Sequence, residues 1–525
     1  MHVESEAVIL TLLLAAATSA SSSAALSPVM PIVAIHIVRH DVFDVNDPDT
    51  SAWPYRAANA LHVVTREQFI RSLLLFREGD PLDAELLEES ARLLRATGFL
   101  SPVTVTSREI EGGAEVVVET FDQWTTKIGL NFGFYGSRGK TGVSLADDNF
   151  LGSGKGVELE YRSDDERDST TASYADPLFL GTRFRLLASH RESSDGSADA
   201  ARVVYPFFAL ATPWAGGIEW RRENLTQYLY ADAEKAVAGQ TYRRTFRLWG
   251  GMRVPSWDDR TDRLTVGLFG EEADYDDWAF LDGRSYETPK DHSLAGIEVG
   301  WEREMHRYEV VRGFRAWQRQ EDLALGPNWS ARIGVSLPAL GGMASTLTLA
   351  GSFDAGVLDG LRYTWVSAAI DGRLEHGHPR DVVLHVEAGR AHTGEAGWRA
   401  RVAADLSQAL DRDRQLALGV DTGLRGWDPD TFDGTQRVVA NLEWRRRLTG
   451  EVLHLAVLGV TAFVDAGRTW GTRVGRNTGT LRADVGIGVL AEITRASLVR
   501  VARLEVAFPD DGSGPVFLLA SGSIF

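Results

Sequence analysis

The fold of this chain is decided by Thr126-Lys127-Ile128-Gly129-Leu130-Asn131-Phe132-Gly133-Phe134-Tyr135. Ile, Leu and two Phe residues stand at every second position, and Lys, Gly and Asn stand between them. Successive side chains of a β-strand point to opposite faces of the sheet. The alternation therefore predicts a strand with one apolar and one polar face.

The same period of two returns along the rest of the chain. Val157, Leu159 and Tyr161 alternate with charged residues, and comparable alternation occurs at 333–337 and 382–386. A soluble β-sandwich also alternates, with its polar face in water and short turns between its strands. Here no helical pattern and no further domain boundary interrupts the strands.

The length and the connectors of this region favour a membrane barrel over a soluble all-β array. The connectors read as long and acidic, at 163–169, 191–200 and 258–262. An apolar outer wall, a polar lumen and charged loops are typical of outer-membrane barrels. At about 25 residues for each strand with its connection, residues 124–525 predict a mainly β fold with a 16-stranded transmembrane β-barrel. The alternative is a soluble β array.

Composition excludes several classes of function. The 525 residues include 55 Lys and Arg against 73 Asp and Glu, a net charge of −18, and no Cys. Nucleic-acid binding needs a basic surface, so we expect no nucleic-acid partner. Without cysteine the chain has no disulfide framework, no thiolate metal site and no cysteine nucleophile.

The N-terminus is typical of an export signal. Residues 7–17 are apolar, and the small residues at 18–25 offer cleavage sites, so we assign 1–25 as a signal peptide. The preceding residues 1–6 lack the usual positive charge, which leaves a different start site or a buried helix as alternatives. No later stretch has the roughly 18 uninterrupted apolar residues of a membrane helix.

A small α+β domain is predicted for residues 26–123. The expected order is strand, helix, helix, strand, strand, with the last two strands joined by Gly112-Gly113, a hairpin signal. Thr65-Arg66-Glu67-Gln68 fits a capping box at the start of the first helix. Gly98 stands where the second helix would end.

Five motifs, taken in order, resemble the superfamily of BamA, TamA and the two-partner-secretion translocators, which includes the bacterial surface antigen family. The domain before the barrel then resembles a POTRA (polypeptide-transport-associated) domain, and the resemblance implies a 16-stranded barrel. The motifs are a hairpin that contains Asn149, Phe150 and Gly152, then Tyr174-Ala175-Asp176-Pro177-Leu178-Phe179, Gln320-Glu321-Asp322-Leu323-Ala324-Leu325-Gly326, Leu424-Arg425-Gly426-Trp427, and Phe463-Val464-Asp465-Ala466-Gly467.

The fourth motif predicts an ion-pair latch inside the barrel. A guanidinium stays charged and is costly to bury alone, so Arg425 at the tip of an inward-folded loop needs acceptors. Strand parity places Glu443 and Asp465 on the lumenal face of neighbouring strands, where they could hold Arg425 in a forked contact. The resemblance implies the same roles for these residues. The alternative is that both carboxylates merely line a solvated lumen, as in porins.

A second segment, Val311-Arg312-Gly313-Phe314, fits the loop-tip pattern in its letters. It precedes the Glu321-Asp322 segment instead of following it, and it lacks a downstream pair of carboxylate strands. The motif has only three fixed letters in an arginine-rich chain. We therefore interpret it as a chance match.

The last strand ends on an aromatic residue, as outer-membrane barrels do. Phe517, Leu519 and Phe525 share one parity and form the C-terminal strand signal. Serines occupy the positions between them on the same face, and the strand is rich in small residues. We hypothesise that Ser521–Ser523 pair weakly with 127–133, so that this seam opens sideways as is thought for BamA-like proteins.

Two functions follow from the resemblance. The first is a machine that inserts or translocates client polypeptides at the outer membrane of a Gram-negative bacterium, with the POTRA domain in the periplasm. The second is a passive pore or a surface-antigen barrel. The expected partners are the lipid bilayer, unfolded outer-membrane or secreted clients, and periplasmic or lipoprotein helpers. No nucleophile elbow or His-Glu-x-x-His helix is present, so we expect no enzyme activity, no cofactor and no metal.

Overall fold

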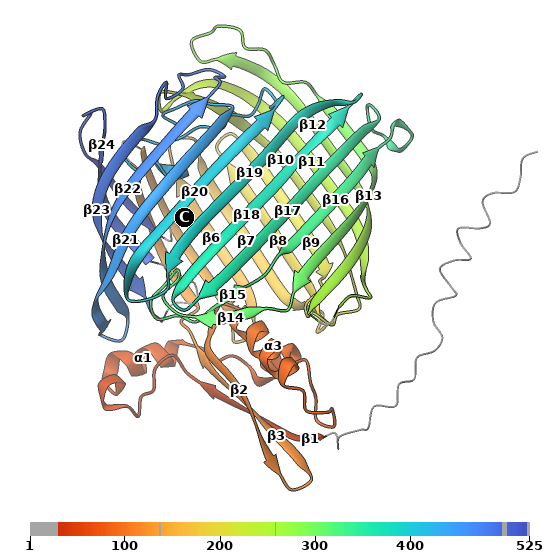
Figure 1. The fold of residues 1–525 in the computed structure, drawn as a ribbon, viewed down its shortest axis with the longest axis vertical. Helices are drawn as coiled ribbons and strands as arrows, with labels where there is room; N and C mark the ends of the chain where they lie inside the picture. Colours follow the sequence, from red (N-terminus) through yellow and green to blue (C-terminus); the bar gives the residue numbers. More distant parts are fainter. Residues whose placement is uncertain (1–29, 136–137, 258, 496–500, 522–525) are drawn as a thin grey trace, which may run out of the picture.

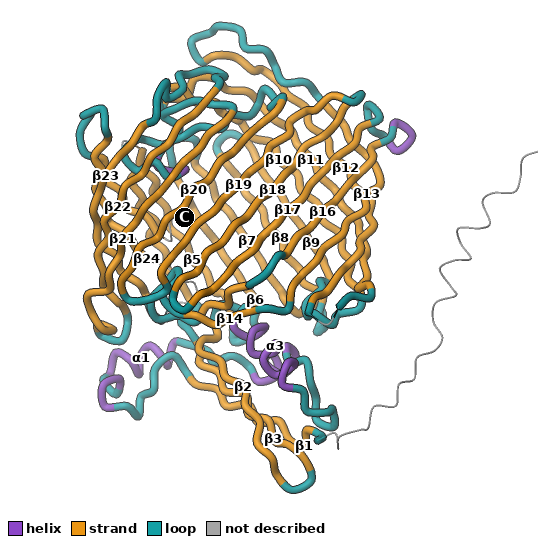
Figure 2. Tube along the Cα trace, viewed as in Figure 1, coloured by secondary structure: helices purple, strands orange, loops and turns teal. Residues whose placement is uncertain are grey.

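The computed structural model describes residues 30–135, 138–257, 259–495 and 501–521. The predicted signal peptide and Phe525 lie outside the described residues. Figure 1 shows two parts, a large sheet of inclined strands and a small domain beneath it. Figure 2 shows that the helices gather almost entirely in the small domain, whereas the large part is strand and loop.

The N-terminal domain contains the predicted strand, helix, helix, strand, strand in that order, with one further helix after the first strand. Its three-stranded sheet has the order β1-β3-β2, in which β1 runs parallel to β3 and β2 runs antiparallel to it. The helices α2 and α3 pack on this sheet around one apolar core. The elements are β1 (Ile32–His40), α2 (Glu67–Leu73), α3 (Ala84–Arg95), β2 (Leu100–Ile110) and β3 (Gly113–Asp122).

The capping-box prediction at Thr65 was wrong. Helix α2 begins after Arg66, which makes no side-chain cap. The Thr65 hydroxyl donates instead to the buried carboxylate of Asp122, with an oxygen–oxygen distance of 2.8 Å. A buried carboxylate needs donors more than a helix end that can be solvated does, so Asp122 takes the hydroxyl.

An insertion that the sequence did not reveal lies between β1 and α2. It contains a short 3-10 turn, η1 (Pro48–Thr50), and the helix α1 (Trp53–Leu61). Among the described residues, no helix combines the length and the apolar character needed to cross a bilayer. Helix α1 lies directly below the rim of the large sheet (Figure 1).

The predicted number of 16 strands was wrong, because the large sheet contains twenty strands within the described residues. All neighbours are antiparallel, and the order of pairing is that of a closed barrel. The strands are β4 (Thr126–Tyr135), β5 (Arg138–Phe150), β6 (Lys155–Ser163), β7 (Asp168–Phe179), β8 (Phe184–Ser193), β9 (Gly196–Tyr205), β10 (Trp214–Ala231), β11 (Glu234–Val254), β12 (Arg260–Phe280), β13 (His292–Met305), β16 (Asn328–Ser336), β17 (Thr346–Asp359), β18 (Arg362–Glu375), β19 (His378–His392), β20 (Ala396–Gln408), β21 (Gln436–Val452), β22 (Ala456–Trp470), β23 (Arg482–Ile493), β24 (Val501–Pro509) and β25 (Val516–Ser521).

The extra strands come from connections that are shorter than expected. The predicted connector at 191–200 lies mostly inside β8 and β9, which are joined by a tight turn. The segment 163–169 shrinks in the same way to a short turn between β6 and β7. Charged residues in these strands belong to the polar face of the wall and not to loops. The chain therefore divides into more strands of ordinary length.

Register identifies the two faces of the sheet. Opposed residues share a face, and the chain of pairs through Glu443, Phe463, Gly486 and Ala507 follows the interior. The alternate residues, such as Ile487 and its neighbours of the same parity, are large, apolar and exposed on the outside. The apolar-out, polar-in pattern predicted from the alternation is therefore present.

Two features interrupt the regular sheet. In the described part of the chain, β25 meets β4 through only two residue pairs, Leu518 with Tyr135 and Leu519 with Phe134. The predicted partners Gly522 and Ser523 lie outside the described residues. The connection from β13 to β16 forms a separate two-stranded hairpin of β14 (Tyr308–Val311) and β15 (Glu321–Ala324), which lies at the barrel end nearest the N-terminal domain (Figure 1).

Candidate functional site

The connection at 409–435, here called the lumen loop, lies at the barrel end far from the N-terminal domain and folds into the interior. A short 3-10 turn, η3 (Val420–Thr422), reverses its direction. Its apolar side chains pack against two residues of the inner wall, Ala403 and Val439. The packed residues of the loop are Leu418, Leu424, Trp427 and Phe432. The loop therefore has its own small core inside the barrel.

Arg425 projects from this loop to the wall, where it meets both predicted carboxylates. Its side chain is 0% exposed. The Nε and Nη2 atoms donate to the two oxygens of Asp465 at 2.6 and 2.9 Å, and Nη1 donates to Glu443 at 3.2 Å. The guanidinium also lies 3.4 Å above the centre of the Phe463 ring. The structure thus brings together Arg425, Glu443, Asp465 and Phe463.

Four further residues complete the cluster and were missed from the sequence. Glu505 accepts from Arg425 Nη1 at 3.4 Å, and Arg503 donates to both Glu505 and Glu443. Asn441 donates to Asp465 at 2.8 Å, and Asp484 accepts the Gly426 backbone N–H at 2.9 Å. Parity in Val501-Ala502-Arg503-Leu504-Glu505 would have placed Arg503 and Glu505 in the lumen.

The cluster is a charge network that needs all its members. Buried charges are costly unless each is paired and hydrogen-bonded, and removing one partner leaves an uncompensated charge. Arg425 shares its donors among three carboxylates, so both faces of its fork are used. The lumen loop is consequently held by a contact that water does not readily replace.

The glycines of the motifs have steric roles. A Cβ on Gly426 would stand 2.6 Å from the Cβ of Asp484, which would prevent the backbone hydrogen bond between them. A Cβ on Gly467 would stand 2.7 Å from Leu418 of the lumen loop. Both positions need glycine because loop and wall approach closely. Trp427 is buried, with its ring centre 5.7 Å from that of Phe432.

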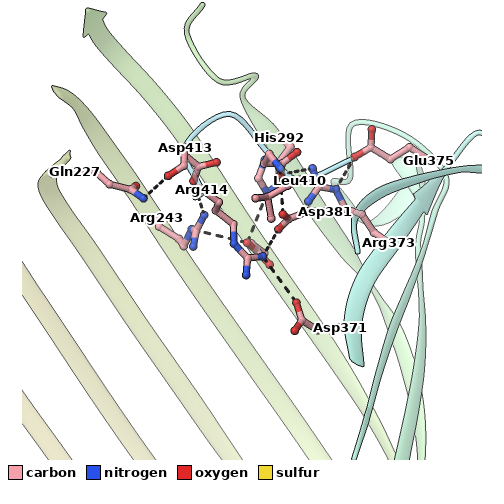
Figure 3. A network of polar contacts seen from close by, with 12 residues as sticks. Gln227, Arg243, His292, Asp371, Arg373, Glu375, Asp381, Leu410, Asp413 and Arg414 are labelled. Atoms are coloured by element: carbon pink, nitrogen blue, oxygen red, sulfur yellow. Dashed lines mark hydrogen bonds and ion pairs between the residues drawn. The ribbon is translucent and has the colours of Figure 1, made fainter. Parts of the chain in front are cut away.

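A second polar network fixes the beginning of the lumen loop (Figure 3). The Asp413 carboxylate accepts from the Tyr275 hydroxyl and pairs with Arg243. Arg414 pairs with Asp381 at 2.6 Å on the other side. Figure 3 shows Arg243, Asp413, Arg414 and Asp381 close together at the start of the loop. The loop is therefore held at its start as well as at Arg425.

The opposite end of the lumen is occupied by residues 306–327, here called the near-end hairpin. Arg445 on β21 donates to the carbonyl oxygens of Gly313, Phe314 and Arg315. The Glu492 carboxylate accepts the backbone N–H of Trp317 at 2.6 Å and that of Gln318 at 3.1 Å. The Trp317 side chain packs with Val457, Leu490 and Val501. The hairpin thus reaches from its own strands to the opposite wall.

The near-end hairpin contains two segments that the sequence analysis singled out. Val311–Phe314 lies in it, where Arg312 is exposed, so rejecting this segment as the buried loop tip was right. The Gln320–Gly326 motif, which resembles a mid-barrel segment of the family, lies outside the barrel wall. Its Glu321–Ala324 part is β15, which pairs with β14 and not with the barrel.

The N-terminal domain contacts the near-end hairpin through α3 and the residues after it. Arg95 of α3 donates to both oxygens of Asp322, at 2.7 and 2.9 Å. The Arg92 guanidinium lies 3.9 Å from the centre of the Tyr308 ring. Arg319 donates to the carbonyl oxygen of Gly98 at 2.9 Å. Three contacts therefore connect α3 and the residues after it to the hairpin.

The Asn149 motif forms a second contact between the domain and the barrel. Asn149 Nδ2 donates to the Thr65 hydroxyl at 2.7 Å, and its Oδ1 accepts the Gly154 N–H at 2.6 Å. The Gly152 carbonyl oxygen accepts the Arg66 N–H at 2.8 Å. Both Gly152 and Gly154 have positive φ, and a Cβ on Gly154 would stand 2.0 Å from the Phe69 ring. The turn between β5 and β6, at the barrel end near the N-terminal domain, therefore packs closely against α2.

The remaining predicted residues lie apart from these clusters. Phe150 is exposed at the end of β5, beside the Asn149 turn. Phe517 is exposed on the outer face of β25, and Leu519 shares its parity. Phe525 lies outside the described residues. No cluster of three or more His, Asp or Glu side chains suited to a metal occurs within the described ranges.

Two neighbouring cavities lie between the N-terminal domain and the inner wall of the barrel. One, of about 600 Å³, lies against the inner wall from β4 to β11. The other, of about 490 Å³, lies between α2, α3 and the near ends of β5 to β8, with Phe69, Leu93 and Phe208 in its apolar lining. The two cavities share lining residues, which are Asp148, Gly156, Ala175 and Leu187.

Comparisons with known proteins gave matches among solved structures only. No family model and no curated protein matches the chain. The CdiB structure from Escherichia coli is 12% identical, over 97% of this chain and 92% of that one, with a TM-score of 0.41. CdiB from Acinetobacter baumannii is 11% identical, over 94% and 74%, with a TM-score of 0.40. BamA from Haemophilus ducreyi lacking POTRA domains 1-3 is 13% identical, over 94% and 84%, with a TM-score of 0.35.

Proposed function

We propose that this chain is an outer-membrane protein of the BamA/TamA type that inserts or translocates client polypeptides. In this proposal residues 1–25 are a signal peptide, 26–123 a periplasmic POTRA domain and 124–525 the membrane barrel. The observation that carries it is the fully buried contact of Arg425 with Asp465 and Glu443. That contact is the one that the resemblance implies for Arg425 of the Leu424-Arg425-Gly426-Trp427 motif, with Glu443 and Asp465 as its acceptors.

The two segments held inside the lumen disfavour a passive pore. A 20-stranded barrel is wide enough for an aqueous channel if its interior is left open. Here the lumen loop enters from one end and the near-end hairpin from the other, each held by buried hydrogen bonds to the wall. A lumen that contains a segment held by specific contacts at each end suits a gated machine better than a porin.

The lumen loop and the near-end hairpin are both bound by residues of the same part of β21. Glu443 binds Arg425 of the lumen loop, and Arg445, two residues later on β21, binds the near-end hairpin. Arg399 is opposite Glu443 in the register, and its guanidinium lies 5.2 Å from the centre of the Phe314 ring in the hairpin. A shift of the hairpin would therefore change the charges around the latch, which gives the N-terminal domain a physical connection to the lumen loop.

A route for a client follows from the same geometry. The strand β2 is an edge of the N-terminal sheet and could receive an extended client strand by β-augmentation. The apolar cavity beside α2 and α3 shares lining residues with the lumenal cavity next to β4. The short pairing of β25 with β4 lies on the same side, so we propose that a client strand leaves through this seam.

Depletion of the protein tests the proposal. Quantitative mass spectrometry of isolated outer membranes should show the loss of a defined set of client proteins, with unrelated barrels unchanged. An Arg425→Lys variant, which keeps the charge and loses the fork, should restore the clients only in part. An unchanged outer-membrane protein profile after full depletion would contradict the machine and favour a surface-antigen barrel.

A further inference from the structure

The helix α1, in the insertion between β1 and α2, has its polar and apolar faces reversed. Asn59 points inward and exchanges two hydrogen bonds with the Phe43 backbone, at 3.2 and 2.7 Å. His62, directly after the helix, is buried and hydrogen-bonded to Asp41 at 2.9 Å. The opposite face is exposed and apolar, and it consists of Trp53, Pro54, Ala57, Ala60 and Leu61.

This exposed face is unlike the water-facing side of a soluble helix. Trp53 is 77% exposed and Leu61 is 76% exposed, although these are the largest apolar side chains of the helix. A helix on a protein surface normally turns its apolar stripe to the core and its polar residues to water. Here Asn59 has its partners inside, which leaves the apolar side chains exposed to a different medium.

The position of α1 indicates what surrounds its exposed apolar face. The Tyr55 hydroxyl donates to the carbonyl oxygen of Leu453 at 3.0 Å, and the Tyr55 ring lies 6.2 Å from that of His454. Leu453 is in the turn between β21 and β22, at the near-end rim of the barrel. That turn carries exposed leucines, and so do the strand ends beside it, at Leu448, Leu453 and Leu455. Figure 1 shows α1 below this edge of the barrel.

We infer that α1 lies in the periplasmic leaflet of the outer membrane and anchors the N-terminal domain to the lipid surface. The inference rests on the proposed membrane position of the barrel. The Tyr55–Leu453 contact places α1 at the rim, next to the exposed leucines of the β21–β22 turn. Trp and Tyr prefer the membrane–water interface, where the ring is apolar and its polar atom stays hydrated. Exposed Arg56 stands at the border of this face, where lipid phosphates would lie.

The absence of cysteine from the chain permits a direct test. Single cysteines at Trp53→Cys, Ala57→Cys and Leu61→Cys would carry an environment-sensitive fluorophore in the full-length protein, reconstituted into phosphatidylethanolamine–phosphatidylglycerol vesicles. Quenching by doxyl-labelled lipid is compared with quenching by aqueous iodide. The reference for lipid is Ile487→Cys, which is exposed on the outer face of β23, and the reference for water is Glu109→Cys near the tip of the β2–β3 hairpin.

The labels at 53, 57 and 61 are expected to be quenched by doxyl lipid to the extent seen at 487, and to be shielded from iodide. If they behave like position 109 while 487 meets lipid, the barrel placement stands and the anchoring role of α1 is overturned. If 487 itself is reached by iodide and not by lipid, the membrane placement of the barrel fails and the inference falls with it. All substituted positions are exposed, so the variants are expected to fold.

Discussion

Arg95 of α3 and Asp322 of β15 lie 227 residues apart in the sequence, and two hydrogen bonds join their side chains. The Arg95 side chain is largely buried in this contact. The pair connects the N-terminal domain to the hairpin that occupies the near end of the lumen. Because the far end of the same hairpin is held by Arg445 and Glu492, a displaced domain cannot leave the hairpin unchanged.

Breaking this pair should loosen the hairpin. Removing one partner of a buried, hydrogen-bonded charge pair costs about 2–5 kcal/mol, so Asp322→Asn should raise amide hydrogen exchange across 312–320. Glu85→Gln, an exposed change on the same helix α3, is the matched control. The exchanged pair Arg95→Asp with Asp322→Arg should recover part of the protection. Equal exchange in Asp322→Asn and wild type would show that the ion pair does not hold the hairpin.

Loss of Arg425 should release the lumen loop while the barrel remains folded. Arg425→Ala leaves Asp465, Glu443 and Glu505 facing one another without their shared cation, at a cost of about 3–5 kcal/mol. Protease added to proteoliposomes should then cleave within 409–435 faster than in wild type. Arg412→Ala, a half-exposed arginine of the same loop, should leave cleavage unchanged. Intact resistance in Arg425→Ala would contradict the latch.

Gly154 and Gly181 have almost the same backbone conformation. Substituting each of them therefore distinguishes an effect on the docking of α2 from an effect of local backbone strain. Gly154 has φ of +73° and faces Phe69, whereas Gly181, in the next near-end turn, has φ of +70° and no atom within 4 Å of an added Cβ. Alanine at either position carries a left-handed backbone cost of roughly 1–2 kcal/mol. Only Gly154→Ala should displace α2, seen as faster hydrogen exchange at 65–70. The same exchange in both variants would mean that the turn does not position the domain.

The pH dependence of the N-terminal domain should report on Asp122. Burial raises the pKa of Asp122 above its ordinary value. The folded domain therefore binds this proton more tightly than the unfolded chain, and its stability falls as pH rises from about 4 through the raised pKa. In Asp122→Asn, whose oxygen can still accept from Thr65, the fall should be absent. The urea midpoint of the domain, followed by a fluorophore at Glu109→Cys, measures it. Parallel pH curves for the two proteins would refute the assignment.

Much of the wall and part of the latch could be predicted because they depend on parity. Alternation fixes which residues face the lumen, and it placed Glu443 and Asp465 on one face. The same rule applied to β24 adds Arg503 and Glu505 to the lumenal face. The strand count failed because polar residues of the inner wall resemble loop residues in sequence, as in β8 and β9.

The near-end hairpin and α1 could not be predicted from periodicity. The hairpin strands are too short to show alternation, and their partners Arg445 and Glu492 lie far away in the chain. Helix α1 has a reversed pattern, so its apolar residues do not mark a core. Thr65 resembled a helix cap because sequence alone does not reveal that Asp122 is buried beside it.

The central claim is that clients pass through a seam between β25 and β4 that must open, and a reversible lock tests it. Tyr135→Cys with Leu518→Cys places two cysteines directly opposite each other across the seam. Ile487→Cys with Val506→Cys does the same across the extended β23–β24 pairing and serves as the control. The measurement is the abundance of client proteins in outer membranes of a depleted strain that expresses either variant. The account predicts that the oxidised seam variant loses the clients as depletion does, that reductant restores them, and that the control retains them throughout. Full client levels with a verified seam disulfide would contradict the account.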